Sequence, residues 1–147
     1  MSDPSSRRSP LHDVHAAAGA AFTEFAGWTM PVRYSGDLKE HAAVRRAAGL
    51  FDLSHMAEIA VLGPQAAQAL DAALLGELSL LALGQARYTL LLTPEGGVVD
   101  DLVVYRTGDD RFLVVANAAN RETVVDHLRD RVVGLDAQIQ EIGRAHV

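Results

Sequence analysis

The sequence predicts an α+β fold with an antiparallel sheet at its centre and helices beside it. Three extended segments follow one another closely, over residues 85–92, 98–105 and 112–116, and turn residues separate them. Helical periodicity precedes this run over residues 64–74 and follows it from residue 120 onward. Short turns between successive strands produce a meander, so the centre of the chain is expected to be antiparallel.

The N-terminal part begins with an alanine-rich stretch, residues 11–18, which predicts a short helix that ends at Gly19. Three aromatic rings follow, and they are expected to anchor the next segment. These rings belong to Phe22, Phe25 and Trp28.

A second helix is expected from Asp37, as its N-cap, to Ala48, with Gly49 as the C′ residue in left-handed geometry. Lys39 and Arg46 are expected to point outward together with Glu40. The apolar residues that are expected to face inward are Leu38, Ala42, Val44, Ala47 and Ala48.

Residues 50–52 and 58–62 have the composition of extended segments. Gly63 and Pro64 then begin another helix, because proline suits the first helical turn. Its apolar residues recur at helical spacing and are Ala67, Leu70, Ala73 and Leu74.

The turns of the meander are expected at residues 93–97 and 108–110. Asn120 is then placed to cap an amphipathic helix. The apolar face of that helix consists of Val124, Val125 and Leu128. A short strand is expected around residues 137–139.

Composition restricts the function. The 147 residues are 49% hydrophobic, which is enough for one domain with a sizeable core. The formal net charge of −6 argues against nucleic-acid binding, and Lys39 is the only lysine. The absence of cysteine excludes disulfides, thiolate catalysis and cysteine-ligated metals, and it fits a cytoplasmic location.

The first ten residues are polar and resemble neither a secretory signal nor a core segment, so residues 1–10 are expected to be a disordered lead-in. No apolar run approaches the roughly 20 residues that a membrane-spanning helix requires. A soluble protein without a membrane partner is therefore expected.

The most informative segment is the strand expected at residues 98–105, which places Asp100 and Asp101 side by side in an apolar run. Successive side chains of a strand point to opposite faces, so one of the two acids faces inward whichever face is buried. A buried carboxylate needs hydrogen bonds or a shifted pKa, and both occur at functional sites. The alternative is a β-bulge or a strand end at which both acids are solvated.

Other polar residues have ordinary explanations. His12 and His15 lack a third ligand at any metal-site spacing, and surface histidines explain them better. Ser54 and His55 are adjacent, and adjacent side chains in an extended segment diverge, which disfavours a nucleophile and its base. The pair at residues 96–97 lacks the lysine and the helix start of a phosphate loop, so a hairpin turn is favoured.

Two further residues stay ambiguous from the sequence pattern alone. Asn117 either closes the turn before Asn120 or belongs to a site. Met56 is either core filler or a lid over a flat ligand.

Five motifs occur in a fixed order along the chain. They are FAGWTMPVRY at residues 25–34, HAAVRRAAGLFDLSHM at 41–56, ARY at 86–88, GGVVDDLVVY at 96–105 and VVANAANRE at 114–122. Together they resemble the T-protein of the glycine cleavage system, a folate-dependent aminomethyltransferase. The resemblance extends from about Pro10 to Arg131.

The resemblance implies the N-terminal fragment of the folate-binding aminomethyltransferase fold. It also implies the chemistry, which is transfer of a methylene from an aminomethyl group on a lipoylated carrier, the H-protein, to tetrahydrofolate with release of ammonia. Tetrahydrofolate is then the acceptor, and no metal is implied. Alone, this portion of the enzyme is expected to be inactive, because the family's chain is more than twice as long.

The family's acid beside the reactive folate nitrogen matches Asp100, which is the expected catalytic residue. Its implied role is to hydrogen-bond the pterin nitrogen and to stabilise developing positive charge. The residues that match the family's pterin surroundings are Met56, Tyr88, Val115 and Asn117. One departure lies at residues 74–77, where the family commonly has an Asn-Asp pair.

The resemblance also suggests how the chain is divided. Residues 11–52 are expected to be an incomplete first-domain segment, and residues 53–140 an α+β domain that carries the folate site. Residues 141–147 have no counterpart in the family and match the translation of a sequencing adapter, so a non-native tail after a truncated gene is expected.

Two other functional classes share these motifs. One is a folate-binding module without aminomethyl transfer, such as the domain of sarcosine and dimethylglycine dehydrogenases, which follows a flavin-binding region. The other is a non-catalytic folate-binding regulator or iron–sulfur assembly protein, whose motifs match less well. The short polar N-terminus favours the aminomethyltransferase over the first class.

Overall fold

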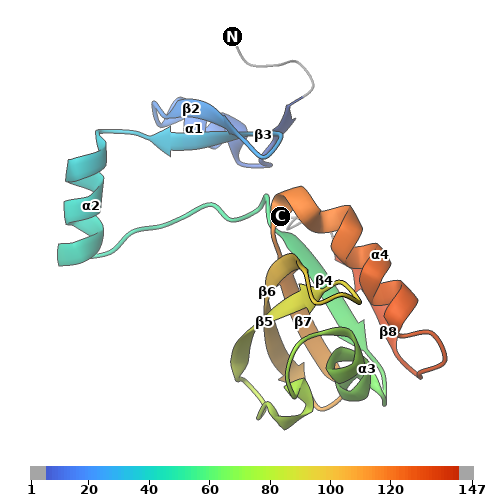
Figure 1. Cartoon of the computed structure of the whole chain (residues 1–147). Helices are drawn as coiled ribbons and strands as arrows, with labels where there is room; N and C mark the ends of the chain where they lie inside the picture. Colours follow the sequence, from blue (N-terminus) through green and yellow to red (C-terminus); the bar gives the residue numbers. More distant parts are fainter. Residues whose placement is uncertain (1–5, 143–147) are drawn as a thin grey trace. The chain divides into compact units, whose positions relative to one another are not determined.

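The computed structural model describes residues 6–142. The chain divides into two compact units, residues 1–55 and residues 56–147 (Figure 1). The boundary expected from the sequence, between residues 52 and 53, lies three residues earlier.

The first unit is built on a three-stranded sheet in the order β1-β3-β2. Strand β1 (Arg7–Arg8) runs parallel to β3 (Trp28–Arg33), and β2 (Ala21–Phe25) runs antiparallel to β3. Helix α1 (His12–Ala17) confirms the first predicted helix to within one residue at each end. The expected disordered lead-in spanned residues 1–10, of which residues 1–5 lie outside the described residues. Residues 6–10 are ordered, because they contain β1 and a serine, Ser9, that is 4% exposed.

The β2–β3 hairpin has no counterpart among the elements expected from the sequence. Its two turn residues, Ala26 and Gly27, have φ values of 51° and 76°. Positive φ at both central positions is typical of a type I′ turn, for which alanine is an unusual residue. Of the expected aromatic anchors, Trp28 is buried, whereas Phe25 is exposed.

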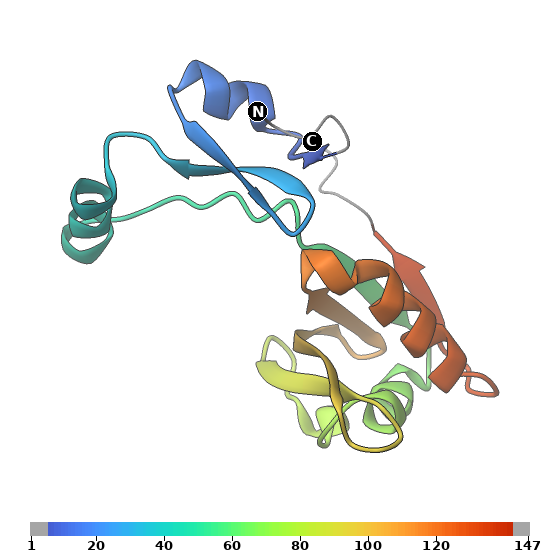
Figure 2. The ribbon, with the colours of Figure 1, turned by 45° about the horizontal axis from the view of Figure 1, so that its top comes forward.

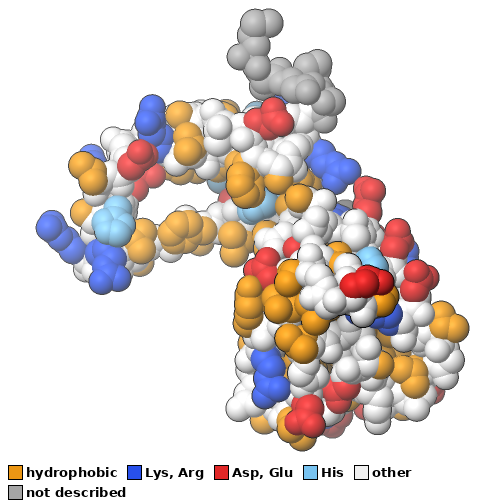
Figure 3. All heavy atoms as spheres, in the orientation of Figure 1, with side chains coloured by type: hydrophobic (Ala, Val, Ile, Leu, Met, Phe, Trp, Pro, Cys, Tyr) orange, Lys and Arg blue, Asp and Glu red, His pale blue; other side chains and the backbone are white. Residues whose placement is uncertain are grey.

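Helix α2 (Asp37–Arg46) has no buried residue, so the predicted inward face is wrong for this chain. Its N-cap is Gly36 rather than Asp37. The Glu40 carboxylate accepts hydrogen bonds from the backbone N–H groups of residues 34, 35 and 36, which hold the pKa of Glu40 below its usual value. The helix ends at Arg46, and Gly49 is not among the left-handed glycines. Basic side chains and a histidine gather over α2 (Figure 3).

The segment after α2 is not a strand, which corrects the expectation for residues 50–52. Hydrophobic side chains line it (Figure 3). Leu50, Phe51 and Leu53 are all exposed. Spacing alone predicts an inward face for such residues, but burial requires a packing partner, which comes from elsewhere in the chain or in an assembly.

The second unit contains a five-stranded antiparallel sheet in the order β5-β6-β7-β4-β8. The predicted meander is confirmed as β5 (Ala86–Leu92), β6 (Val98–Gly108) and β7 (Arg111–Ala116). The other strands are β4 (Ala57–Leu62), which begins one residue before its predicted start, and β8 (Gln138–Glu141), which begins one residue after its predicted start and ends two residues after its predicted end. The predicted turn at residues 93–97 is also confirmed, with Gly96 at a φ of 87°.

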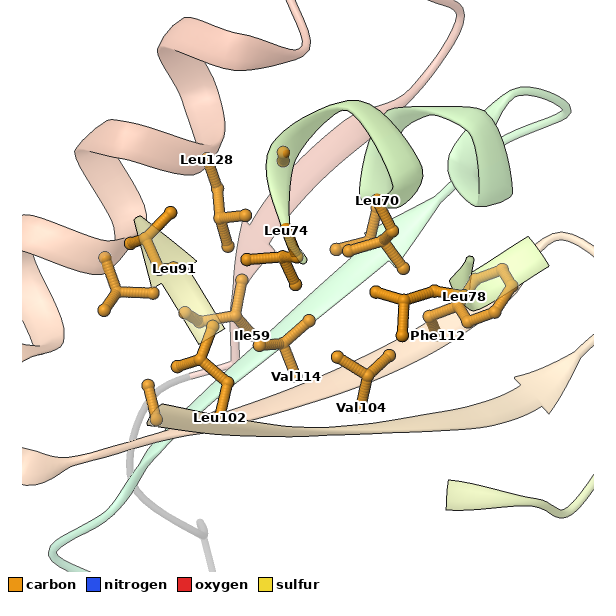
Figure 4. Packing of buried hydrophobic residues seen from close by; sticks show 14 of the residues in the cluster. Ile59, Leu70, Leu74, Leu78, Leu91, Leu102, Val104, Phe112, Val114 and Leu128 are labelled. Carbon is orange, nitrogen blue, oxygen red and sulfur yellow. The ribbon is translucent and has the colours of Figure 1, made fainter. Parts of the chain in front are cut away.

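Helices cover one face of this sheet, and Figure 2 shows α4 (Arg121–Arg131) lying across it beside β8. Helix α3 (Ala66–Ala73) packs against α4, and two short 3₁₀ turns are η1 (Leu78–Leu80) and η2 (Ala118–Asn120). The core lies between the sheet and the helices (Figure 4). Its largest fully buried side chains include Phe112, Ile59, Leu70 and Leu128, and burial of this apolar surface stabilises the unit. One packed face is typical of an antiparallel sheet.

Residues 141–147 were expected to be a non-native tail, but the first of them, Glu141, is part of the sheet. Glu141 is the last residue of β8 and pairs with Ile59, and its side chain forms an ion pair with Arg121. The N–H of Ile142 donates to the carbonyl of Glu58. Residues 143–147 lie outside the described residues, and the origin of the segment stays a prediction.

Gly63 begins the connection from β4 to α3 in a conformation that requires glycine. Its φ is 123°, and a Cβ there would lie 2.6 Å from the backbone oxygen of Asp136. We expect Gly63→Ala to destabilise the unit by about 3 kcal/mol in urea denaturation, because both the backbone and the neighbouring chain must shift. Gly134→Ala is the matched control, since Gly134 also has a positive φ of 89° but open space around it. An equal cost of about 1 kcal/mol at both positions would contradict the predicted clash.

Candidate functional site

Strand β6 presents the two adjacent carboxylates to opposite faces of the sheet. Asp100 is 3% exposed and shares the helix-covered face with Leu102 and Val104. Asp101 is exposed and shares the opposite face, which we call the outer face, with Tyr105. The prediction that one acid faces inward is therefore confirmed, and the inward acid is Asp100.

A register shift accompanies this arrangement. Leu91 pairs with Asp100 but Leu92 pairs with Val98, so β6 carries one extra residue, Val99, just before the acids. Such a bulge bends and twists a strand and changes where the following side chains point. The alternative interpretation of the sequence was a β-bulge or strand end with both acids solvated. The bulge is present, but Asp100 is buried, so only part of this alternative is correct.

The Asp100 carboxylate binds three N–H groups at the junction of β7 and α4. Its Oδ2 accepts from the backbone N–H of Asn117 at 3.1 Å, and its Oδ1 accepts from Asn117 Nδ2 at 3.0 Å and from Asn120 Nδ2 at 2.7 Å. Hydrogen bonds of this kind compensate for the removal of a carboxylate from water. Asp100 therefore holds the start of α4 against β6, and both of its oxygens are already engaged.

The Asp101 carboxylate receives two hydrogen bonds and is otherwise open to solvent. Asn117 Nδ2 donates to Asp101 Oδ1 at 2.8 Å and to the Asp101 backbone oxygen at 3.2 Å. The Tyr88 hydroxyl, on the neighbouring strand β5, donates to Asp101 Oδ2 at 3.1 Å. This hydrogen bond raises the pKa of Tyr88, and the charges of Asp101 and Asp100 add to the effect. One amide group, that of Asn117, thus joins the buried acid to the exposed one.

The remaining predicted site residues lie at the same end of the sheet. Val115 pairs with Val103, which in turn pairs with Tyr88, so all three share the outer face. Met56 and Asn117 flank the paired residues Ala57 and Ala116, which places Met56 just before β4 begins. The structure therefore brings together Tyr88, Asn117 and the acid pair by hydrogen bonds, whereas Val115 and Met56 adjoin them without a polar contact.

Sequence reasoning missed two members of this group. Asp101 was considered as one of two acids that could face inward but not as a site residue, because its place on the face of Tyr88 depends on the register between β5 and β6. Asn120 was expected to cap α4, and it does occupy the N-cap position, but its side chain makes no capping hydrogen bond. The position was correct, and the partner of the side chain could not be deduced from local sequence.

A second polar cluster lies in the first unit, where His15 is 9% exposed and not a surface histidine. Its Nε2 donates to Asp52 Oδ2 at 2.8 Å, and its Nδ1 is hydrogen-bonded to the Tyr34 hydroxyl at 2.6 Å. Ser9 and Ser54 also donate their hydroxyl protons to the Asp52 carboxylate. The cluster ties together the beginning, middle and end of this unit.

The same cluster shows whether Ser54 and His55 form a nucleophile and its base, an arrangement that the sequence disfavours. Ser54 Oγ donates to Asp52 and not to His55, so the two residues do not form a nucleophile and its base. The His55 ring meets the Trp28 ring edge-on, with centroids 6.4 Å apart. His12 packs against Phe22. Within residues 6–142, no group of His, Asp and Glu side chains is arranged to hold a metal ion.

None of the helices in the described part of the chain is long and apolar enough to cross a membrane.

Comparison with known families places this geometry in context. Residues 11–147 match the family described as the GCVT N-terminal domain. The chain belongs to this family. The family assignment and the α+β fold agree, since a crystal structure of glycine cleavage system aminomethyltransferase T from Bartonella henselae superposes with a TM-score of 0.87 at 46% identity. That superposition covers 90% of this chain and 37% of the Bartonella henselae chain.

Curated members related to this GCVT N-terminal domain carry the name aminomethyltransferase. The protein of Saccharopolyspora erythraea is 56% identical over 142 residues, which are 97% of this chain and 38% of that protein. The protein of Cutibacterium acnes is 58% identical over 135 residues, 92% of this chain and 36% of that protein. The chain therefore spans a little over a third of the length of these relatives.

Proposed function

We propose that this chain is the N-terminal portion of a glycine cleavage system aminomethyltransferase. The complete enzyme would take the methylene of an aminomethyl group from the lipoylated H-protein, pass it to tetrahydrofolate and release ammonia. The observation that carries the proposal is the hydrogen-bonded acid pair at one end of the second sheet, in a chain whose relatives of about half or more identical sequence are named aminomethyltransferases.

The reaction exchanges bonds at a single carbon. The methylene loses its bonds to the lipoyl sulfur and to the amino nitrogen, and it gains bonds to two folate nitrogens. The two protons that the folate nitrogens lose balance the equation, because one goes to the sulfur and the other to the departing amine, which leaves as ammonia. A carboxylate beside a folate N–H helps by orienting it and by stabilising the positive charge that develops there.

Of the two acids, we assign contact with the folate nitrogen to Asp101. The resemblance assigned this contact to Asp100, but Asp100 is only 3% exposed and its carboxylate is held by three N–H groups at the junction of β7 and α4. Asp101 faces the outer side together with Tyr88 and Val115, two residues expected to surround the pterin. Asp100 then acts through Asn117, which it holds in place. Met56 lies beside Asn117 and completes this pterin surface.

The proposal includes cytoplasmic location and a place in glycine catabolism. The absence of cysteine from all 147 residues is consistent with a reducing compartment. The portion of the enzyme that would hold the folate tail corresponds to the remaining length of the relatives, so transfer activity is expected only when that portion is present.

A chimera tests the proposal directly. This chain replaces the matching segment of the Bartonella henselae enzyme, to which it is 46% identical. Ammonia release is measured with aminomethyl-loaded H-protein and tetrahydrofolate. We expect the chimera to be active, and Asp101→Asn to lower kcat on the order of 100-fold, because a positioned carboxylate is removed. Asp110→Asn, in the β6–β7 turn, is the matched control and is expected to keep full activity.

One result would overturn the proposed function, and another would overturn the role assigned to Asp101. A chimera with native circular dichroism that binds tetrahydrofolate but releases no ammonia would show a folate-binding module in place of a transferase. An active chimera whose Asp101→Asn variant keeps the parental kcat would remove Asp101 from the mechanism.

A further inference from the structure

Asn120 occupies the N-cap position of α4 but does not use its side chain to cap the helix. An N-cap asparagine ordinarily accepts a hydrogen bond from a backbone N–H of the first helical turn, which stabilises the helix by about 1 kcal/mol. Here Asn120 Nδ2 donates to Asp100 Oδ1 at 2.7 Å and to the Val99 backbone oxygen at 3.4 Å. The side chain is thus directed at the strand that carries the acid pair.

The hydrogen bond from Asn120 affects how Asn117 divides its own donors. Asn117 Nδ2 carries two protons, yet it lies within hydrogen-bond distance of three oxygens: Asp100 Oδ1, Asp101 Oδ1 and the Asp101 backbone oxygen. The Asp101 contact is the shortest of the three, at 2.8 Å. Because Asn120 already donates to Asp100 Oδ1, that oxygen depends less on Asn117.

We propose that Asn120 is a positioning residue of the site, which keeps the Asn117 amide directed at Asp101 by satisfying Asp100 itself. When Asn120 is removed, Asp100 Oδ1 loses its nearest donor and draws the Asn117 amide toward it. The Asp101 carboxylate then loses the donor that fixes one of its oxygens and rotates away from Tyr88. The inference rests on the proposed function, since it assigns Asp101 the contact with folate.

A purely structural role predicts a different pattern. If Asn120 only ties α4 to β6, its loss lowers stability and leaves the geometry of Asp101 and Tyr88 unchanged. Serine at this position separates the two roles, because it caps a helix as well as asparagine does but is too short to replace the Asn120 amide at Asp100. Asn120→Ser is therefore expected to keep α4 folded while releasing Asp100.

The test measures Asn117 and Tyr88 in this chain at full length. In ¹H–¹⁵N spectra of Asn120→Ser, we expect the Asn117 side-chain amide signals to move. We also expect the pKa of Tyr88 to fall toward its ordinary value of 10.0, since the hydrogen bond to Asp101 raises it. The pKa is measured by following the ultraviolet absorbance of the tyrosines as the pH is raised. Subtracting the titration of Tyr88→Phe leaves the contribution of the Tyr88 phenol. Thr123→Ala, an exposed change in the first turn of α4, is the control and is expected to move neither signal.

In an active chimera, Asn120→Ser is further expected to lower kcat about 10-fold. Unchanged Asn117 signals and an unchanged Tyr88 pKa in Asn120→Ser would overturn the inference, and so would a parental kcat. The spectroscopic measurements need no folate. They therefore decide the positioning role even where the chimera shows that the proposed transfer function is wrong.

Discussion

Replacement of Asp100 by alanine is expected to lower the free energy of unfolding of the second unit by about 3 kcal/mol. The change removes the acceptor for three N–H groups contributed by Asn117 and Asn120, at a carboxylate that is only 3% exposed. Buried donors left without an acceptor retain their desolvation cost. Hydrogen exchange of the β6 and β7 amides in urea measures the loss within this unit.

Asp101→Ala is the matched control for this prediction, because it removes an identical carboxylate from the next position. Asp101 is exposed, so water replaces the lost contacts and the expected cost is below about 1 kcal/mol. Equal losses for the two variants would show that Asp100 does not hold the β7–α4 junction.

Replacement of Asp52 by alanine is expected to destabilise the first unit by about 3 kcal/mol. The Asp52 side chain is 4% exposed, and it accepts hydrogen bonds from His15, Ser9 and Ser54. The unit has few buried apolar residues to compensate, of which Trp28 is 1% exposed. Because Trp28 is the only tryptophan of the chain, its fluorescence during urea denaturation reports on this unit. Asp13→Ala, an exposed change in α1, is the control.

The same residue gives the first unit a defined pH dependence. Burial by itself would raise the pKa of Asp52, but hydrogen bonds from Ser54, Ser9 and His15 outweigh it and hold that pKa well below its ordinary value of 3.8. The folded state therefore binds fewer protons than the unfolded state, and the stabilisation is complete above about pH 5. This stabilisation is lost progressively as the pH falls through the ordinary pKa of 3.8 and below it. The Trp28 transition should weaken between about pH 5 and 2 in the parent but not in Asp52→Ala.

Local sequence predicted the second unit well. The meander, α3 and α4 follow from periodicity and turn residues that act over a few positions, and Gly96 supplies the positive φ that its turn requires. Resemblance supplied the family and the candidate residues Tyr88 and Asn117. The alternation of a strand showed that one acid is buried, but it could not show which one, because that depends on which face the helices cover.

The first unit was predicted less well for a physical reason. The burial of His15 depends on Asp52 and Tyr34, which lie 37 and 19 residues away. The β2–β3 hairpin turns at Ala26, a residue without a strong turn preference, so no local signal marks it. For α2, the periodic apolar residues were visible, but their exposure reflects what surrounds the helix and not the helix sequence.

The alternation of side chains along β6 gives two identical neighbouring amino acids, Asp100 and Asp101, opposite mutational tolerance. A library of variants at these two positions, selected only for folding, should retain aspartate at residue 100 and accept many residues at 101. Only Asp100 is buried and accepts hydrogen bonds that the fold needs. A library selected for catalysis should restrict both. Comparing the two selections would separate the cost of building the site from the demands of the reaction it serves, at adjacent positions of one strand.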